Sequence, residues 1–290
     1  MTTQGNGGNS WVEWLESPPG QYLLRWEQGQ YDAEVADVFG YFALQCGLPP
    51  LDCLRANRMP NRILARGLRD AQAGPGGDAG WGRAAVDGAE NHPAVATVRV
   101  AHFEELPFDA QSVDLVVLPH VLEFAADPHQ VLREVERVLR PEGRVIVSGL
   151  NPVSLWGAHQ ATISRLRPGF LPREGQFIGL PRLRDWLKLL GFELDRGRYG
   201  CYRPPCRTQR WLDRTAFMEK AGDRWWPICG AAYMVAAVKR VRGMRLVGRV
   251  WTKRALARAP AATASQRRAL ELPARGSLSD RGIRETEEVG

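Results

Sequence analysis

Residues 113–147 carry the pattern that most constrains the fold. The run from Val113 to Leu118 is almost continuously apolar, which is typical of a strand buried on both faces. Asp127 and Pro128 suit the N-cap and the first position of a helix. The apolar stripe of that helix consists of Val131, Leu132, Val135, Val138 and Leu139, and residues 145–147 predict the next strand. A strand, a helix and a strand within about forty residues predict parallel strands joined by a right-handed crossover.

Weaker patterns on both sides extend this unit into a larger α/β fold. Helical periodicity is expected over 17–40, 51–57 and 181–190, and strands are expected over 41–46, 62–65, 96–103, 192–194 and 230–238. We therefore expect a Rossmann-like, doubly wound and mostly parallel sheet.

Composition divides the chain into three regions. Residues 1–16 are expected to be a disordered N-terminus and 17–240 a single α/β domain. Within that domain, 67–93 reads as a flexible Gly-rich insertion and 199–227 as an ordered but irregular Arg/Trp-rich excursion. Residues 241–290 are expected to be a basic C-terminal extension and a disordered tail.

Charge and cysteine content narrow the classes of function. The formal net charge of +7 suits an anionic partner such as nucleic acid or a lipid surface, and equally a basic protein with no such partner. The five cysteines have no metal-site spacing, so we expect reduced thiols and no metal site. The N-terminus lacks a signal-peptide pattern, and the apolar stretch 225–238 is shorter than the roughly 20 residues of a bilayer span. These features predict a cytoplasmic location.

Two motifs resemble those of a known family. Leu106-Pro107-Phe108 precedes Val113-Asp114, and the run 132–143 reads LREVERVLRPEG. A later turn, 187–192, reads LKLLGF. Together these closely resemble the class I S-adenosylmethionine-dependent methyltransferases, in the branch that includes quinone, sterol and many small-molecule methyltransferases. The resemblance implies a seven-stranded sheet of the class I methyltransferase type and S-adenosyl-L-methionine as cofactor.

The resemblance also implies where the cofactor would lie. The positions that match the family's strand ends are Gly47, His102, Phe103, Leu118, Pro119 and His120. The family's glycine-rich turn falls on 44–50, which here has a single glycine and two prolines without N–H donors. The family's adenine-side aspartate falls on His102, and Asp87 is a weak candidate for holding the ribose.

His120 is the weak candidate for a catalytic residue. It follows the strand 113–118 at the edge where open α/β sheets bind ligands, and it is otherwise a loop residue that caps a backbone group. Asn151 ends the neighbouring strand and is expected to form a turn. His129 is expected to be solvated.

Three functions stay open at this point. The first is a methyltransferase that acts on an unidentified small-molecule or macromolecular acceptor. The second is a non-catalytic protein that kept the fold as a binding or scaffold module. The third is an RNA-directed protein, catalytic or not, that uses the basic run from Lys239 to Arg258, although that run also suits a membrane surface or a solvated extension. The Arg/Trp-rich excursion could stack bases or hold a flat anionic substrate, or could pack structurally.

Overall fold

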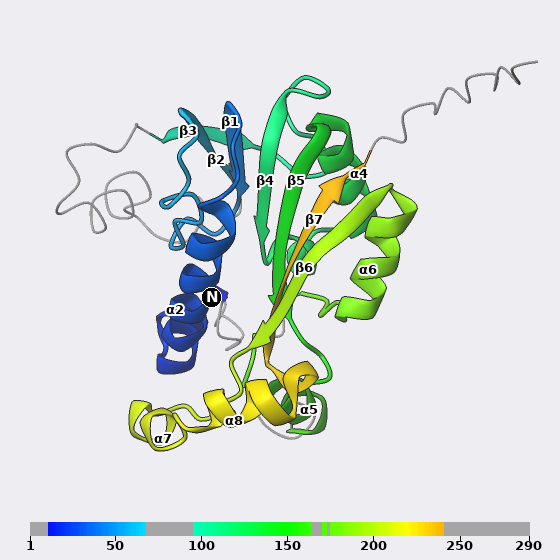
Figure 1. The fold of residues 1–290 in the computed structure, drawn as a ribbon. Helices are drawn as coiled ribbons and strands as arrows, with labels where there is room; N and C mark the ends of the chain where they lie inside the picture. Colours follow the sequence, from blue (N-terminus) through cyan, green and yellow to red (C-terminus); the bar gives the residue numbers. More distant parts are fainter. Residues whose placement is uncertain (1–10, 68–94, 164–169, 173–174, 241–290) are drawn as a thin grey trace, which may run out of the picture. The chain divides into compact units, whose positions relative to one another are not determined.

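The computed structural model describes residues 11–67, 95–163, 170–172 and 175–240. They form a seven-stranded sheet in the order β3-β2-β1-β4-β5-β7-β6 (Figure 1). The strands are β1 (Phe42–Cys46), β2 (Asn61–Gly67), β3 (Ala96–Val100), β4 (Val113–Pro119), β5 (Leu139–Leu150), β6 (Phe192–Gly200) and β7 (Ala232–Lys239). Only β7 runs antiparallel to its neighbours among these strands. The predicted Rossmann-like, mostly parallel sheet is therefore confirmed.

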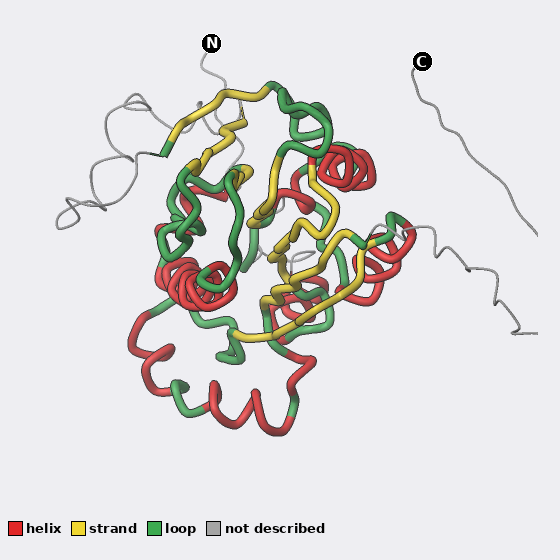
Figure 2. Tube along the Cα trace, turned by 45° about the horizontal axis from the view of Figure 1, so that its top comes forward, coloured by secondary structure: helices red, strands yellow, loops and turns green. Residues whose placement is uncertain are grey.

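Helices cover both faces of this sheet (Figures 1 and 2). They are α1 (Trp11–Glu16), α2 (Pro18–Val35), α3 (Val121–Phe124), α4 (Pro128–Val138), α5 (Leu155–Ile163), α6 (Leu180–Leu189), α7 (Gln209–Arg214) and α8 (Met218–Trp225), with a 3-10 turn η2 (Pro227–Cys229). One apolar core joins α1 and α2 to the sheet, and a second core joins α4 and α6 to the opposite face.

The β4–α4–β5 unit has the structure that its sequence predicts. The carboxylate of Asp127 accepts hydrogen bonds from the backbone N–H groups of His129 (2.9 Å) and Gln130 (3.1 Å), which caps α4. Along β4, Leu115 and Val117 belong to the core under α2. Val113, Val116 and Leu118 belong to the core under α4. Both faces of the strand are thus buried, which explains its nearly continuous apolar sequence.

Asp114 fastens the beginning of β1 to the middle of the sheet. Its Oδ2 atom accepts hydrogen bonds from the backbone N–H groups of Tyr41 (2.7 Å) and Phe42 (3.0 Å). Its Oδ1 atom accepts one from Arg140 at 3.1 Å. A β carbon at Gly40 would lie 2.5 Å from Cβ of Asp114, so this close approach requires glycine.

The crossover from β1 to β2 differs from the prediction. The helix expected over 51–57 is replaced by single turns, such as the bond from the N–H of Leu51 to the carbonyl of Leu48 (3.1 Å). The side-chain amide of Gln45 holds this loop, because it donates to the carbonyls of Gly47 (3.2 Å) and Leu51 (2.6 Å). Its carbonyl accepts the N–H of Cys53 at 3.0 Å. A buried side chain thus satisfies backbone groups that a helix would have satisfied internally.

The structure also bears on the expectations for the N-terminus, the Arg/Trp-rich excursion and the Gly-rich insertion. Residues 11–16 form α1, with Trp14 and Leu15 buried, so the disordered N-terminus is wrong for those residues because apolar packing orders them. The excursion 199–227 is irregular over 201–208, as expected, but contains two helices, α7 and α8, after it. In the Gly-rich insertion, Gly67 is the last residue of β2, and 68–93 lie outside the described residues, as do 1–10 and 241–290.

Lys239 is also not the solvated start of a basic extension. It is the last residue of β7 and is buried. Its ammonium donates to the backbone carbonyls of Glu136 and Leu139 (3.0 Å) and lies 2.8 Å from the carboxylate of Glu136. Its cationic head ties β7 to the end of α4, so it cannot contact RNA in this fold.

Candidate active site

The carboxyl ends of β1, β3 and β4 bring several of the predicted residues together. Gly47, directly after β1, has a φ of +69°, a left-handed conformation that favours glycine. A β carbon built at Gly47 would lie 3.4 Å from Val121 and 3.5 Å from the ring of Phe103. His102 is exposed and follows β3. These residues form one edge of the sheet, as predicted, because the strands are parallel.

The remaining predicted cofactor residues do not present side chains to this edge. Leu118 is completely buried in the core under α4, and Pro119 is buried at the end of β4. The side chain of His120 is buried as well and lies 2.8 Å from Glu27 of α2. Among the predicted residues, His102 is exposed and Phe103 is half-buried, whereas Gly47 and the residues at the end of β4 are buried.

His120 lies between two carboxylates inside the protein. Its Nε2 atom is 2.8 Å from Oε1 of Glu27 on α2, and its Nδ1 atom is 2.7 Å from Oε2 of Glu123 on α3. All three side chains are at most 1% exposed. The other carboxylate oxygen of Glu123 accepts the backbone N–H of Leu150 at the end of β5. We call these three residues the His120 cluster.

The charges of the His120 cluster are set by burial and by mutual attraction. Burial opposes the charged imidazolium, but the carboxylates of Glu27 and Glu123 outweigh it and raise the pKa of His120 to about 10. Burial raises the pKa of Glu123, and the nearby imidazolium partly offsets this. His120 is therefore an imidazolium at neutral pH, which donates a hydrogen bond from Nδ1 to Glu123 and forms an ion pair with Glu27.

Aromatic side chains enclose the cluster. The ring of Trp11 on α1 lies 5.0 Å from the ring of His120 and 5.1 Å from that of Phe124. Tyr31 lies one turn beyond Glu27 on α2 and is fully buried, which raises the pKa of its hydroxyl well above the ordinary value. Within the described residues, Oε2 of Glu27 has no hydrogen-bond partner. Buried oxygens of this kind are uncommon and are candidates for function.

Sequence reasoning identified His120 but missed both of its carboxylate partners. Glu27 lies four residues from Leu23 and from Tyr31, so a carboxylate occupies the apolar stripe of α2. That position was the available signal, because a charged residue within a buried stripe needs a partner. Glu123 gave no comparable signal, since the short helix α3 was expected only as a connection.

The other candidates have structural roles. The side-chain amide of Asn151 donates to the carbonyls of Ile228 (2.8 Å) and Gly230 (2.9 Å) and accepts the N–H of Val153 (3.1 Å), so its predicted role in a turn is confirmed. His129 is exposed, as expected, and lies against Trp186.

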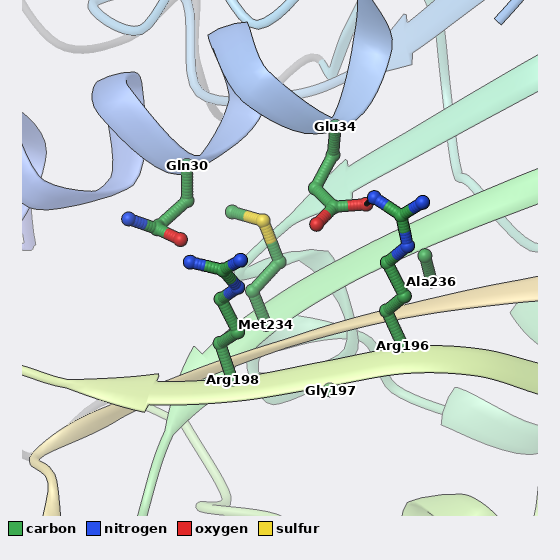
Figure 3. A pocket seen from close by; sticks show the side chains of 7 residues that line it. All are labelled: Gln30, Glu34, Arg196, Gly197, Arg198, Met234 and Ala236. Atoms are coloured by element: carbon green, nitrogen blue, oxygen red, sulfur yellow. Dashed lines mark ion pairs between the residues drawn. The ribbon is translucent and has the colours of Figure 1, made fainter. Parts of the chain in front are cut away.

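A small surface hollow lies between α2 and the outer strands β6 and β7 (Figure 3). Its lining residues are Gln30, Glu34, Arg196, Gly197, Arg198, Met234 and Ala236. The guanidinium of Arg196 lies 3.9 Å from the carboxylate of Glu34. The hollow contains none of the predicted site residues.

In the part of the chain that the structure describes, no helix is long and apolar enough to cross a membrane. The same residues contain no group of three or more His, Cys, Asp or Glu placed to hold a metal ion. All five cysteines are free thiols, and burial raises the pKa of Cys46 to about 12.

Comparison with known proteins supports a methyltransferase relationship. A family model for a methyltransferase domain matches residues 82–147. The uncharacterized protein YafS of Escherichia coli (strain K12) is 42% identical over 89 residues, which are 31% of this chain and 36% of that protein. The uncharacterized protein MJ1123 of Methanocaldococcus jannaschii is 28% identical over 96 residues, 33% of this chain and 46% of that protein. The matches therefore span less than half of either relative.

Solved structures agree on the fold. A chain in a complex of the Haloferax volcanii Trm112 methyltransferase activator with a protein described as a methyltransferase has a TM-score of 0.55 and 16% identity. The match covers 82% of this chain and 99% of that one. A protein from Listeria monocytogenes described as an S-adenosylmethionine-dependent methyltransferase has a TM-score of 0.51 and 12% identity, over 76% of this chain and 99% of that one. At these identities the likeness establishes the fold.

The strand order and the solved structures together define the fold. This chain has the class I methyltransferase fold, and its residues 82–147 match the family model of a methyltransferase domain.

Proposed function

We propose that this protein is an S-adenosylmethionine-dependent methyltransferase whose acceptor reacts beside the His120 cluster. The observation that carries the proposal is a buried, partly unpaired carboxylate, Glu27, at the carboxyl end of β4 in a methyltransferase fold. Ligands of open α/β sheets bind at that edge.

The residues at the strand ends fit the cofactor in part. Gly47 takes the left-handed conformation that lets backbone approach a ligand, and Phe103 beside it offers a partly exposed ring to a flat base. His102 is exposed and can bind an adenine amine through one imidazole nitrogen. We propose that these three residues hold the cofactor. When bound, S-adenosylmethionine supplies an electrophilic methyl group on a positively charged sulfur.

The His120 cluster suits uptake of a proton from the acceptor. The cluster places two carboxyl groups against a single imidazolium in a buried place. Transfer of the acceptor's proton to Glu27 would leave His120 paired with Glu123. His120 is thus proposed as a positioning residue and Glu27 as the base. Because Trp11 lies over His120, the acceptor reaches this place only when α1 moves aside.

Calorimetric titration of the full chain with S-adenosylmethionine and with S-adenosylhomocysteine tests the proposal. We expect binding of both by the wild-type protein and at least tenfold weaker binding by Phe103→Ala, since roughly 1.4 kcal/mol of ring contact is lost. Glu27→Gln serves as the matched variant and should bind both as the wild type does. Absence of heat at millimolar ligand, with native circular dichroism, would rule out the methyltransferase.

The β1–β2 crossover favours a second candidate, a non-catalytic member of the family. Its turns replace a helix after Gly47, and Pro49 and Pro50 offer no N–H donors to a ligand. In that case the protein keeps the fold as a binding module. The same titration distinguishes the two candidates, because the binding module should give no heat with either compound.

Two finer expectations from the sequence are kept as proposals. A cytoplasmic location agrees with five free thiols, which a reducing compartment maintains. RNA binding through the basic run can involve only residues after Lys239, all but Arg240 of which lie outside the described residues.

A further inference from the structure

The segment between β6 and β7 carries an unusual number of exposed aromatic side chains. Phe217 (69% exposed), Trp225 (67%) and Ile228 (64%) lie on α8, η2 and the turn before them, together with exposed Trp211 and Trp226. Figure 1 shows α8 beside α5, beyond the ends of β5 and β6, and α7 further out on the other side of α8. We call residues 209–228 the outer segment. Burying one such side chain in an apolar phase is favourable by about 1.5–3 kcal/mol, so leaving several in water is costly.

The outer segment is fixed to the domain by its inward side. Leu212 is completely buried, and Gly222 packs so closely that a β carbon would lie 2.2 Å from the ring of Tyr202. Asn151 binds the carbonyl of Ile228, which ties the segment to the turn that carries exposed Val153. The exposed aromatic side chains are therefore presented by a fixed scaffold.

Cations accompany these apolar side chains. The outer segment, 209–228, has four basic and three acidic residues. One of the acids, Glu219, is more than half buried, and burial raises its pKa to about 7, which lowers its negative charge near neutral pH. Arg210, Lys220 and Arg224 are exposed. Asp213 and Asp223 are exposed as well, so the segment presents apolar side chains together with a small excess of cations.

We propose that the outer segment docks this protein onto an anionic lipid bilayer. Tryptophan, phenylalanine and isoleucine beside arginine and lysine suit the boundary between acyl chains and anionic headgroups. A single-stranded RNA surface is less well matched, because the rings of Trp225 and Trp226 meet at 76° and form no parallel stacking platform. Exposed Ile228 and Val153 also have no flat face on which a base could stack.

Cosedimentation of the full chain with vesicles tests this surface. We compare phosphatidylglycerol–phosphatidylethanolamine vesicles with phosphatidylcholine vesicles, using the wild-type protein, Trp225→Ala/Ile228→Ser and Lys220→Glu/Arg224→Glu. Leu189→Ser is the matched control, because Leu189 is 84% exposed but lies on α6, outside the outer segment. We expect binding to the anionic vesicles only, and at least about tenfold weaker partitioning for both double variants and none of that loss for the control.

Several results would overturn the proposal. They are absence of binding by the wild-type protein, unchanged binding by both double variants, and an equal loss in the Leu189→Ser control. Quenching of tryptophan fluorescence by brominated lipid provides a second readout, which should weaken in Trp225→Phe/Trp226→Phe. Loss of affinity for a single-stranded RNA oligonucleotide, with vesicle binding intact, would assign the surface to RNA instead. None of these measurements involves S-adenosylmethionine, so the result is independent of the proposed methyltransferase activity.

Discussion

The Nδ1 atom of His120 lies 2.7 Å from Oε2 of Glu123, three residues further along the chain. His120 itself has a φ of +55°, a left-handed conformation that is uncommon for residues other than glycine. The ion pair and the strained backbone occur together at the end of β4, where the fold places its ligand-binding edge.

The raised pKa of His120 predicts that the cluster loses stability in alkaline solution. The folded-state pKa of about 10 exceeds the ordinary value of 6.5, so the stabilisation is fully present below pH 6.5 and is lost as the pH rises to 10. We expect the free energy of unfolding to fall over this window by up to about 1.4 kcal/mol per pH unit. The raised pKa of Glu123 acts in the same direction but begins above pH 4.5.

Urea unfolding of the wild-type protein and of His120→Gln at pH 6, 8 and 10 measures this effect. The stability difference between the two should shrink as the pH rises. A difference that stays constant between pH 6 and pH 10 would show that His120 is neutral in the folded protein.

Gly47 and Gly29 form a matched pair for substitution by alanine. Gly47→Ala should destabilise the protein by about 1–2 kcal/mol, because alanine adopts its positive φ with strain. Gly29 is exposed within α2, and an added β carbon meets nothing within 4 Å. Gly29→Ala should therefore stabilise the protein by up to about 1 kcal/mol. Thermal unfolding checks both, and equal effects of the two substitutions would contradict the assigned role of Gly47.

Lys239→Met should destabilise the fold without affecting nucleic-acid binding. The substitution leaves the carbonyls of Glu136 and Leu139 without their donor, which costs about 1–3 kcal/mol. Arg240→Met, at an exposed neighbouring position, should have a smaller effect. Denaturant unfolding gives the comparison. A Lys239→Met protein that is as stable as the wild type and binds RNA more weakly would restore the original prediction for Lys239.

Asn151→Ala should loosen the outer segment as well as the turn. The buried amide makes three hydrogen bonds, two of them to the carbonyls of Ile228 and Gly230, and their loss costs about 2–3 kcal/mol. Hydrogen exchange should accelerate at residues 228–231 but not in α4. Uniform acceleration across both regions would indicate global rather than local destabilisation.

The sequence predicted the centre of the sheet well because local and tertiary requirements agree there. Val113–Leu118 needs to be buried on both faces, and Asp127 is a helix cap in either a peptide or a protein. The crossover after β1 was mispredicted because the buried side chain of Gln45 makes hydrogen bonds to the backbone of the loop. The sequence pattern of residues 51–57 contains no sign of these hydrogen bonds.

A residue of the candidate site could be predicted only where its position at the end of a strand places it at the ligand-binding edge. His120 follows β4, and the edge rule places any such residue near a ligand. Its partner Glu27 lies 93 positions away, on a helix whose packing depends on the whole sheet. For α7 and α8, aromatic and cationic residues were evident, but their helical order depends on Leu212 and Gly222 packing against the domain.

Asp114 makes the amino end of β1 more resistant to fraying than an ordinary strand end. The first strand starts with two amides, at Tyr41 and Phe42, that are held by one side chain from the adjacent strand. Strand ends are ordinarily the first places where deuterium enters, because they open without global unfolding. Here the carboxylate of Asp114 holds that end through two hydrogen bonds. Removal of the carboxylate would let the amino end of β1 open, while the opposite end, beside Gly47, stays paired.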